Sequence, residues 1–574
     1  MGANYTLSFH TTHNSGAAML RDGQIVAAAS EERFTRIKHY SSLPYESIRY
    51  CLDEAGIEPE DVDAIAVPSD VVPWGVKLLL DWDDYDPDNV SQGSQPLSKT
   101  VKKRMAERVR GVRNKTSMPE YARQVRFPQD IPLHTVNHHE AHAASAYYTC
   151  GNDESLVVTS DGLGDDISLT VWHGNDGELD ELLRVGKEGS LGWFFGVVTQ
   201  ALGWWVGNGE GKTMGLASYG DAPVELVDEL REICPVYRDG RLVDGSDTDY
   251  AGEWRVKDTY HWDFDETSHV EELLEEYERE DVADAAQQLL EEQVFDVVRH
   301  WMDETGAENL ALAGGVFLNV AVNRKLIHEL DPDDFHVFPA AGDDGLPVGA
   351  ALASYYSRNP GAEPLHLQHP DLGPGFTSSH VETVLDQRKL TYEKQESIVD
   401  AVADLLLDGN IVAWFQGRME YGPRALGNRS ILIDPRLTDG NDRVNAEIKF
   451  RESWRPFAPS VLDRAVDDYL VDPIADPFMV TSFEVRDERE DEIPAVTHVD
   501  GTTRPQVVKE ENNPRYYDLI DTFDSKGGVP LVLNTSFNLS GDPIVCSVED
   551  AIDTFYNCGL DALAVGDHLL QKEK

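Results

Sequence analysis

The stretch LVVTSDGLGDDISLTVW, residues 156–172, decides the fold class of this chain. Two apolar runs, 156–160 and 168–172, lie on either side of a turn made of small and acidic residues. Both runs contain β-branched residues, and glycine and aspartate mark the turn, so we predict two strands joined as a hairpin. Two strands around a turn of this kind form a recurrent phosphate-binding arrangement.

The beginning of the chain has a similar plan. Residues 4–9 and 24–29 are also strand-like, and the turn Arg21-Asp22-Gly23 lies between them, so we expect a second hairpin. Duplicated units of this type are typical of the two lobes of actin-like and sugar-kinase folds. The sequence therefore favours an α/β protein with a duplicated first part.

The remaining elements divide the chain into two α/β regions. In the first region, the pattern predicts an amphipathic helix over 283–304, a strand with a Gly-Gly turn within 309–319, and a helix over 346–358. A connector containing proline, glycine and histidine follows at 359–376 and marks the main boundary. The second region is expected to contain a helix over 396–409, strands over 411–415 and 530–533, and a helix over 548–557. We therefore predict domains at 1–365, with an insertion at 71–130, and at 366–574.

The charge of the chain is strongly unbalanced. Its 574 residues include 104 acidic and 49 basic side chains, a formal net charge of −55. Such self-repulsion is tolerable where salt screens it, because the Debye length falls to about 3 Å near 1 M salt. We therefore hypothesise a halophilic cytoplasm, with an ordinary acidic protein as the alternative. An acidic surface also disfavours nucleic acid as a partner.

Several classes of protein are disfavoured by what the sequence contains. Because the longest apolar runs are short and the first residues do not resemble a signal peptide, we expect a cytoplasmic protein without a membrane partner. The five cysteines form no CxxC pair, which argues against a disulfide framework or a cysteine zinc site. The locally basic stretch 99–115 is either a docking surface for an anion or a solvated helix face.

Two histidines indicate a metal site. His138 and His142 are four residues apart, so a helix places both imidazoles on one face. Asp161 and Asp343 occupy similar loops and could complete a site of two imidazoles and two carboxylates, which suits Fe, Mn or Zn. The alternative is a pair of surface or capping histidines.

Two further motifs are less specific. The loop after the first strand contains His13, which could act as a general base because its pKa lies near neutrality, or could be a structural turn residue. The run Glu210-Gly-Lys-Thr resembles the end of a Walker A loop. The required glycine five positions before Gly211 is replaced by Val206, so a P-loop is rejected.

The densest signal is WFQGRMEYGPRALGNRSI, residues 414–431. Together with the residues that follow, it places eight cations between positions 418 and 455. These are Arg418, Arg424, Arg429, Arg436, Arg443, Lys449, Arg451 and Arg455. Arginine binds phosphates and carboxylates through two parallel hydrogen bonds, so an anion pocket is the natural interpretation. The alternative is ion pairing with Asp434, Asp442 and Glu447.

With these motifs in order, the chain resembles the NodU/CmcH carbamoyltransferase family almost from end to end. The arginine-rich motif is the most specific part of the match. The other matching segments are 10–15, 31–36, His138-xxx-His142, Asp161-Gly162, 210–215, 314–319, 342–345, 455–460 and 533–538. The resemblance implies an actin-like ATPase (ASKHA) domain, similar to the tRNA threonylcarbamoyl transferase, followed by a YrdC-like α/β domain.

The resemblance also implies the activity and its site. The second domain would join carbamoyl phosphate and ATP, with Mg, into carbamoyladenylate, and the first would transfer the carbamoyl group to a hydroxyl of a small molecule or glycan. The metal, iron in the family, would be held by His138, His142, Asp161 and Asp343, with Asp344 as a competitor for the last place. His13, Arg418 and Lys449 would be catalytic. The implied ligands of carbamoyl phosphate and nucleotide are Arg418, Arg424, Arg429, Lys449, Arg455, Arg504, Asn534, Ser536, Gly314, Gly315 and Asn319.

Other readings share parts of this pattern. A threonylcarbamoyl-type tRNA-modifying enzyme would need a basic RNA surface, which the charge of −55 disfavours. A small-molecule kinase with the ASKHA fold would have no use for the arginine-rich motif. A hydrogenase-maturation enzyme would carry CxxC zinc motifs, which this chain lacks. A sensor that only binds nucleotide would show no metal-dependent catalytic turnover. Whether the protein forms a homodimer is left open.

Overall fold

The computed structural model describes residues 3–70, 126–238, 240–243, 267–452 and 454–572 apart from residue 129, together with 72, 79, 90–91, 256–258 and 263–264. The chain forms two compact units. Unit 1 comprises Met1–Thr35 and His39–Leu367, and unit 2 comprises Arg36–Lys38 and Gln368–Lys574. The basic stretch 99–115 and most of the predicted insertion lie outside the described residues. Within the described part, no helix is both long and apolar enough to cross a membrane.

The first sheet of unit 1 has the order β3-β2-β1-β4-β6-β5. Its strands are β1 (Tyr5–His10), β2 (Gly16–Arg21), β3 (Gln24–Ser30), β4 (Ala64–Pro68), β5 (Val90–Ser91) and β6 (Leu133–Val136). Strands β1, β2 and β3 are antiparallel neighbours, whereas β4 and β6 run parallel to β1. The predicted hairpin between 4–9 and 24–29 is therefore wrong in its pairing. An additional strand, β2, lies between them, because residues 16–20 are small or apolar and are buried in the sheet.

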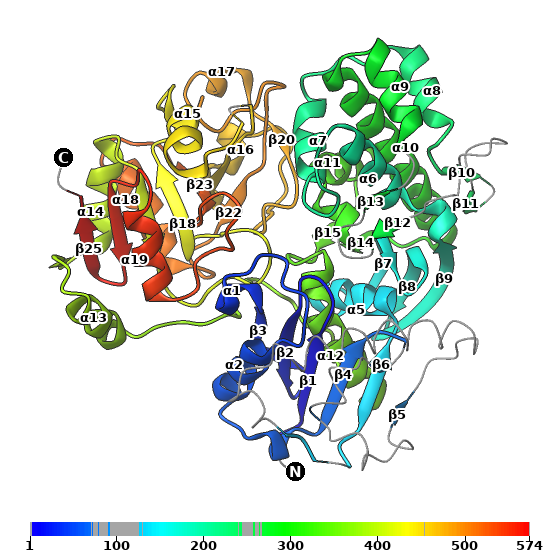
Figure 1. Ribbon diagram of the computed structural model, residues 1–574, viewed down its shortest axis with the longest axis horizontal. Helices are drawn as coiled ribbons and strands as arrows, with labels where there is room; N and C mark the ends of the chain where they lie inside the picture. Colours follow the sequence, from blue (N-terminus) through cyan, green and yellow to red (C-terminus); the bar gives the residue numbers. More distant parts are fainter. Residues whose placement is uncertain are drawn as a thin grey trace. The chain divides into compact units, whose positions relative to one another are not determined.

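The second sheet of unit 1 repeats this order as β9-β8-β7-β14-β15. Its strands are β7 (Glu154–Gly164), β8 (Ile167–Asn175), β9 (Glu178–Gly186), β14 (Asn309–Ala313) and β15 (Asp334–Val337). The hairpin predicted from residues 156–172 is confirmed, since β7 and β8 pair in antiparallel fashion. Strands β14 and β15 then add in parallel, as β4 and β6 do in the first sheet. Unit 1 thus contains two sheets of the same topology (Figure 1).

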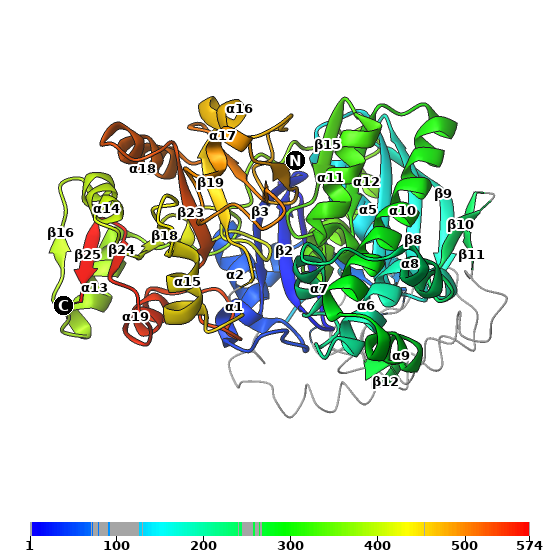
Figure 2. The ribbon, with the colours of Figure 1, turned by 90° about the horizontal axis from the view of Figure 1, so that it is seen from above.

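Two helices lie between these sheets (Figures 1 and 2). Helix α5 (His138–Cys150) packs on β7 and β14, and α12 (Leu346–Arg358) packs on β1 and β4. The helices approach closely because residue 349 is glycine: a Cβ there would lie 1.8 Å from the carbonyl oxygen of Ala141. The helix predicted at 346–358 is confirmed, and the helix predicted at 283–304 forms the larger part of α10 (Arg279–Thr305).

The remaining described helices and strands of unit 1 lie at its periphery. They are α1 (Glu32–Thr35), α2 (Tyr45–Ala55), α6 (Leu191–Ala201), α7 (Glu210–Ala217), α8 (Val224–Arg231), α9 (Ser268–Glu276), α11 (Val320–Leu330), β10 (Val236–Arg238), β11 (Arg241–Val243), β12 (Val256–Asp258) and β13 (Asp263–Phe264).

Unit 2 is built on an eight-stranded mixed sheet with the order β16-β25-β24-β17-β18-β23-β19-β22. The strands are β16 (Glu393–Lys394), β17 (Val412–Phe415), β18 (Arg429–Ile433), β19 (Ala458–Leu462), β22 (Gln506–Val508), β23 (Leu531–Ser536), β24 (Ala562–Val565) and β25 (His568–Gln571). A short ribbon, β20 (Phe483–Glu484) with β21 (Thr502–Thr503), completes the strands. The predicted strands 411–415 and 530–533 correspond to β17 and to the beginning of β23.

Helices of unit 2 cover this sheet (Figure 2). They are α13 (Ser378–Gln387), α14 (Ile398–Leu407), α15 (Gly440–Val444), α16 (Val466–Tyr469), α17 (Asp487–Glu490), α18 (Pro514–Ser525) and α19 (Val548–Tyr556). Helices α14 and α19 confirm the helices predicted at 396–409 and 548–557. A π-helix, Asn445–Lys449, follows directly after α15. The sequence did not indicate this rare element.

Candidate functional site

A candidate metal centre in unit 1 begins with the first turn of α5. The Asn137 side chain caps the helix by accepting the His139 backbone N–H at 3.0 Å, and the Asp165 carboxylate accepts the His138 N–H at 3.0 Å. These two caps set the beginning of the helix at His138. His138 and His142 then present their imidazoles one turn apart on the same face, as the spacing predicts.

Two carboxylates meet these imidazoles. Asp161 lies within β7, and Asp343 begins a short 3₁₀ helix, Asp343–Gly345, that leads into α12. The Asp161 Oδ2 atom lies 3.4 Å from His138 Nε2 and 3.3 Å from His142 Nε2, and Asp343 Oδ1 lies 3.5 and 3.9 Å from the same two nitrogens. One ligand atom from each of the four residues lies within 4.8 Å of the others.

Glycine at position 164 makes room for this arrangement. A Cβ on Gly164 would lie 2.1 Å from ring atoms of His138, a separation that real side chains do not adopt. Gly315 similarly leaves space beside Asp161, because a Cβ there would be 3.0 Å from the Asp161 Oδ1 atom. The position of the His138 imidazole therefore requires glycine at residue 164, whereas a side chain at residue 315 would crowd the Asp161 carboxylate by only a few tenths of an ångström.

The electrostatics of the cluster favour a bound cation. Burial would lower the pKa of His138, but the Asp343 and Asp161 carboxylates outweigh it and raise that pKa to about 9. Burial raises the pKa of Asp343 to about 7. The two Nε2 atoms face each other at 3.1 Å, and the buried His142 Nδ1 has no hydrogen-bond partner within the described residues. Two imidazoles and two carboxylates that converge in this way fit a divalent transition metal.

The other histidines near this centre have different surroundings. His13 places its Nε2 3.1 Å from Asp343 Oδ2 and is partly exposed, whereas the buried His10 places its Nε2 3.8 Å from the same oxygen. Sequence reasoning singled out His13 but missed His10, although both belong to the same loop motif. His139 is buried and structural: its ring contacts Thr159 Oγ1 at 2.6 Å and the Ile167 carbonyl oxygen at 2.9 Å.

The neighbouring acidic residue, Asp344, is not part of the cluster. Burial raises its pKa to about 6, and the nearby Arg33 guanidinium opposes that shift. Of the two adjacent aspartates, the structure therefore brings Asp343 to the histidines.

The Gly314–Asn319 motif lies beside the same centre. Gly314 has φ of +101°, and a Cβ there would lie 2.2 Å from the Ser160 carbonyl oxygen, so the turn requires glycine. Asn319 caps α11 by accepting the N–H groups of Ala321 and Val322, and its amide also bonds with Gln287. Asn319 therefore has a structural role in α11, and its expected contact with nucleotide stays a prediction.

In unit 2, the arginine-rich motif forms a loop around a buried carboxylate. The Glu420 Oε1 atom accepts the backbone N–H groups of Leu426, Asn428 and Arg429 at 2.6, 2.8 and 3.3 Å. A single acceptor thus organises the loop between β17 and β18. Sequence analysis did not single out Glu420, because one acid among many carries no signal.

Two arginines of the motif support this loop from inside. Arg429 is 0% exposed, its terminal nitrogens donate to the carbonyl oxygens of Gln416 and Pro374 at 2.5 and 3.0 Å, and its guanidinium lies 3.7 Å from the centre of the Phe415 ring. These contacts give Arg429 a structural role in the loop, and its expected contact with the ligand stays a prediction. Arg418 donates to the carbonyl oxygens of Leu372 and Gly373, and its expected role at the ligand stays a prediction.

A second group of cations has a different environment and forms a candidate anion site. Burial and then the charge of Arg455 lower the pKa of Arg424 to about 10 and that of Arg451 to about 9. Burial, followed by Arg424 and Arg451, lowers the pKa of Arg504 well below its usual range. Within the described residues, none of these guanidiniums lies within ion-pair distance of a carboxylate.

Lys449 completes this anion site. It is 5% exposed, and its Nζ donates to Asn538 Oδ1 at 2.8 Å, to the Ser536 carbonyl oxygen at 2.5 Å and to Ser536 Oγ at 3.2 Å. Burial and then the nearby Arg451 and Arg455 lower its pKa well below the usual range. Asn534, also in β23, donates its side-chain amide to Ser460 Oγ and to the Ala425 carbonyl oxygen, and its expected contact with the ligand stays a prediction.

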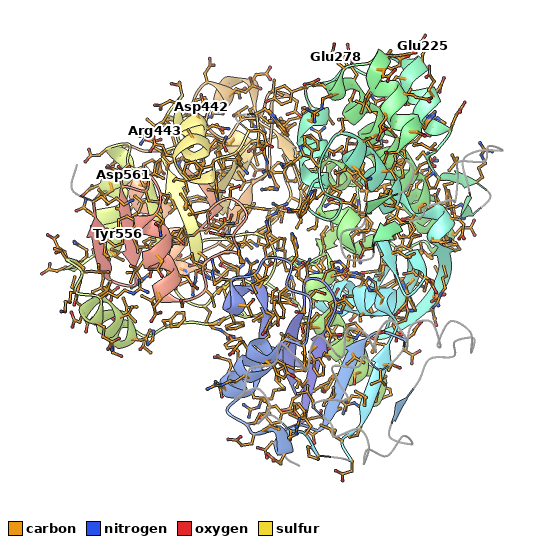
Figure 3. The ribbon with its side chains drawn as sticks, viewed as in Figure 1. Glu225, Glu278, Asp442, Arg443, Tyr556 and Asp561 are labelled. Carbon is orange, nitrogen blue, oxygen red and sulfur yellow. The ribbon has the colours of Figure 1, made fainter. Side chains whose placement is uncertain are left out.

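Some of the basic residues between positions 418 and 455 form ion pairs, which was the alternative to an anion pocket. Arg436 pairs with Asp434 at 2.7 Å, and Arg443 lies 3.9 Å from both Glu447 and Asp561. Figure 3 labels Asp442, Arg443 and Asp561 on the outside of unit 2. Arg451, one of the eight cations of the sequence pattern but not among the ligands that the resemblance implies, joins Arg424, Arg455 and Arg504 in the unpaired group. A guanidinium stays protonated at physiological pH, so this group is suited to bind an anion.

The comparisons with known proteins identify the family of this chain. Carbamoyltransferase N-terminus and C-terminus family models match residues 6–352 and 403–572. Nodulation protein NolNO of Sinorhizobium fredii is 36% identical over 98% of this chain and 79% of its own length. The 3'-hydroxymethylcephem-O-carbamoyltransferase of Amycolatopsis lactamdurans is 25% identical over 99% of both chains. A solved structure of full-length HypF covers 62% of this chain and 56% of its own, with 13% identity and a TM-score of 0.36. Because both family models match in order, the chain belongs to the carbamoyltransferase family and is a carbamoyltransferase.

Proposed function

We propose that the protein transfers a carbamoyl group from carbamoyl phosphate to a hydroxyl group, with ATP consumed to form a carbamoyladenylate. Unit 2, proposed to be YrdC-like, would form the adenylate. Unit 1, proposed to be an actin-like ATPase (ASKHA) domain, would carry out the transfer. The repeated topology of its two sheets supports the second assignment.

The observation that carries this proposal is the unpaired cation group of unit 2. Arg424, Arg451, Arg455 and Arg504 are partly buried near one another and near Lys449, and among the described residues none of them lies within ion-pair distance of a carboxylate. Such a concentration of positive charge within a chain of net charge −55 favours binding of a polyanion. Carbamoyl phosphate and the triphosphate of ATP are polyanions of suitable chemistry.

The adenylation step balances without any further reactant. Water releases phosphate from carbamoyl phosphate and leaves carbamate, and a carbamate oxygen then displaces pyrophosphate from the α-phosphorus of ATP. The cations stabilise the negative charge that develops on the phosphoryl oxygens. The Lys449 ammonium group, held by Ser536 and Asn538, is fixed in direction before the reactants bind.

In unit 1 the acceptor oxygen would attack the carbamoyl carbon, AMP would leave, and His13 would take the acceptor proton. The metal proposed for His138, His142, Asp161 and Asp343 is Fe(II), with Mn or Zn as alternatives. When bound, such a metal would polarise a carbonyl or hydroxyl oxygen. Asp343 would keep His13 in place through its second oxygen, Oδ2, which lies 3.1 Å from His13 Nε2.

The first test is pyrophosphate release from ATP in high KCl without any acceptor. Release that requires carbamoyl phosphate is the expected result and would establish the first half-reaction. Formation of ADP instead would favour the kinase alternative. A strict requirement for tRNA during turnover would favour the threonylcarbamoyl-type alternative. Absence of release from folded, metal-loaded protein, even after alcohols and sugars are added, would contradict the proposal.

A further inference from the structure

The residue after Lys449 has an uncommon conformation. The π-helix Asn445–Lys449 ends at Phe450, whose backbone is left-handed with φ of 44° and ψ of 49°. Its ring is 62% exposed, and it makes no aromatic contact within the described residues. A bulky side chain rarely adopts this backbone conformation, and π-helical turns occur frequently at functional sites.

The neighbours of Phe450 explain how this conformation persists. On one side, the Lys449 Nζ is held by Ser536 and Asn538. On the other side, the Arg451 Nε donates to Asn445 Oδ1 at 2.6 Å, and its guanidinium lies 4.3 Å from the centre of the Phe457 ring. Both flanking side chains are fixed in the anion site, so the backbone between them has little freedom.

Phe450 is therefore an exposed aromatic residue that lies in the sequence directly between two cations of the anion site. Consecutive Cα atoms are about 3.8 Å apart, so a ligand whose phosphates contact Lys449 and Arg451 can place a planar group against the ring. Nothing in the folding of unit 2 requires an aromatic residue here, since the ring is not part of the core. A nucleobase is the planar group that accompanies a triphosphate, and every base has a face that stacks on an aromatic ring.

We propose that the Phe450 ring is the stacking surface for the base of the nucleotide bound by unit 2. This inference rests on the proposed adenylation function and adds the residue that binds the base. The cations would bind the phosphates of any polyphosphate, and Phe450 would distinguish a nucleotide from an inorganic polyphosphate.

Tyr556 provides a matched control in the same unit. Its ring is 49% exposed, but it lies in the regular helix α19, where it packs against Phe555 with ring centres 4.9 Å apart. It has no left-handed backbone and does not adjoin residues of the anion site in sequence. Figure 3 labels it on the outside of unit 2.

The experiment measures the affinities of ATP and of inorganic tripolyphosphate for the full-length protein by calorimetry, at constant KCl and Mg. The variants are Phe450→Ala, Phe450→Trp and Tyr556→Ala. Phe450→Ala should weaken ATP binding about 5- to 150-fold, as expected for loss of one base–aromatic stack, and leave tripolyphosphate binding unchanged. Phe450→Trp and Tyr556→Ala should bind ATP within about twofold of the unsubstituted protein, because each keeps an aromatic ring at position 450.

The other outcomes separate the two hypotheses. If Phe450→Ala binds ATP as tightly as the unsubstituted protein, or loses tripolyphosphate to the same degree, Phe450 does not bind the base. If the unsubstituted protein binds neither compound, the adenylation function itself fails. Equal loss in Tyr556→Ala would also overturn the assignment, because the effect would then not be specific to the ring beside the cations.

Discussion

Arg424 and Arg429 are five positions apart in one loop, yet their environments differ. Arg429 is wholly enclosed and donates to backbone carbonyls, whereas Arg424 has cationic neighbours and no carboxylate partner within the described part of the chain. Arg429→Ala should therefore destabilise unit 2 by about 3 kcal/mol, because several buried carbonyls lose a charged donor. Urea denaturation of the full-length protein measures this change.

Arg424→Gln should give the opposite pattern. Removing one of several repelling cations should leave the free energy of unfolding unchanged or slightly raised, while pyrophosphate release falls at least about tenfold through loss of a charge-assisted contact. Both variants are assayed side by side for denaturation midpoint and for pyrophosphate release. A stable, fully active Arg424→Gln protein would remove Arg424 from the site.

The strained backbone at residue 450 gives a separate stability prediction. Glycine adopts the left-handed region without a steric cost, so Phe450→Gly should raise the free energy of unfolding by about 1 kcal/mol. Phe450→Ala, which keeps a Cβ, should not, and it serves as the control. Chemical denaturation without nucleotide checks both. A fall in stability for Phe450→Gly would show that the ring contributes to folding and not only to binding.

At the scale of elements, the contact between β7 and α5 positions the metal ligands. Gly164→Ala would place a methyl group 2.1 Å from the His138 ring, so the imidazole must move. Metal content after loading, measured by atomic emission, should fall by more than half. Gly211→Ala in α7 is the control, since no atom lies within 4 Å of its Cβ and alanine favours a helix. Retention of full metal content by Gly164→Ala would argue against His138 as a ligand.

The buried histidine of β15 makes unit 1 sensitive to acid. His336 is bonded to Thr149 Oγ1 at 2.9 Å, and burial together with the nearby His366 lowers its pKa from 6.5 to about 3. Below pH 6.5 the imidazole is protonated in the unfolded chain, whereas in the folded chain it stays neutral down to about pH 3. Acid therefore favours the unfolded state. At pH 5 this single group should reduce the free energy of unfolding by about 2 kcal/mol.

The variant His336→Gln isolates that contribution. Glutamine can still donate a hydrogen bond toward Thr149 but does not titrate, so the fall in denaturation midpoint between pH 7.5 and 5 should be smaller than in the unsubstituted protein. Identical pH dependence in the two proteins would mean that folding does not lower the pKa of His336. The comparison cancels the other titrating groups, because they are common to both.

Patterns of local sequence predicted elements better than pairings or contacts. The 156–172 hairpin and the 346–358 helix were predictable because the spacing of hydrophobic residues along the sequence indicates which side chains are buried in a strand or a helix. Strand β2 was missed because its small residues, beginning at Gly16, resemble a loop. The roles of Arg429 and Glu420 could not be predicted, because they depend on backbone carbonyls and N–H groups that only the folded loop brings together.

At the scale of the whole molecule, the charge of −55 opposes compactness. Exposed acids follow one another along α8, α9 and the beginning of α10, where Figure 3 labels Glu225 and Glu278. Few cations lie near these acidic side chains to pair with them, so the side chains repel one another over long distances. The halophilic hypothesis therefore predicts that screening of this repulsion by salt stabilises the folded chain.

We expect the thermal midpoint to rise steeply between 0.1 and 1 M KCl, as the Debye length falls from about 10 to about 3 Å, and to level off above that concentration. Sucrose at equal osmolality controls for exclusion of solutes from the surface and should not reproduce the steep part. In Glu225→Gln/Glu278→Gln the midpoint at 0.1 M KCl should be higher, and the gain on adding salt smaller, because two repelling charges have been removed. A midpoint that is constant or falls with KCl would mean that local pairing already balances the acids, and that the composition serves solubility and not stability.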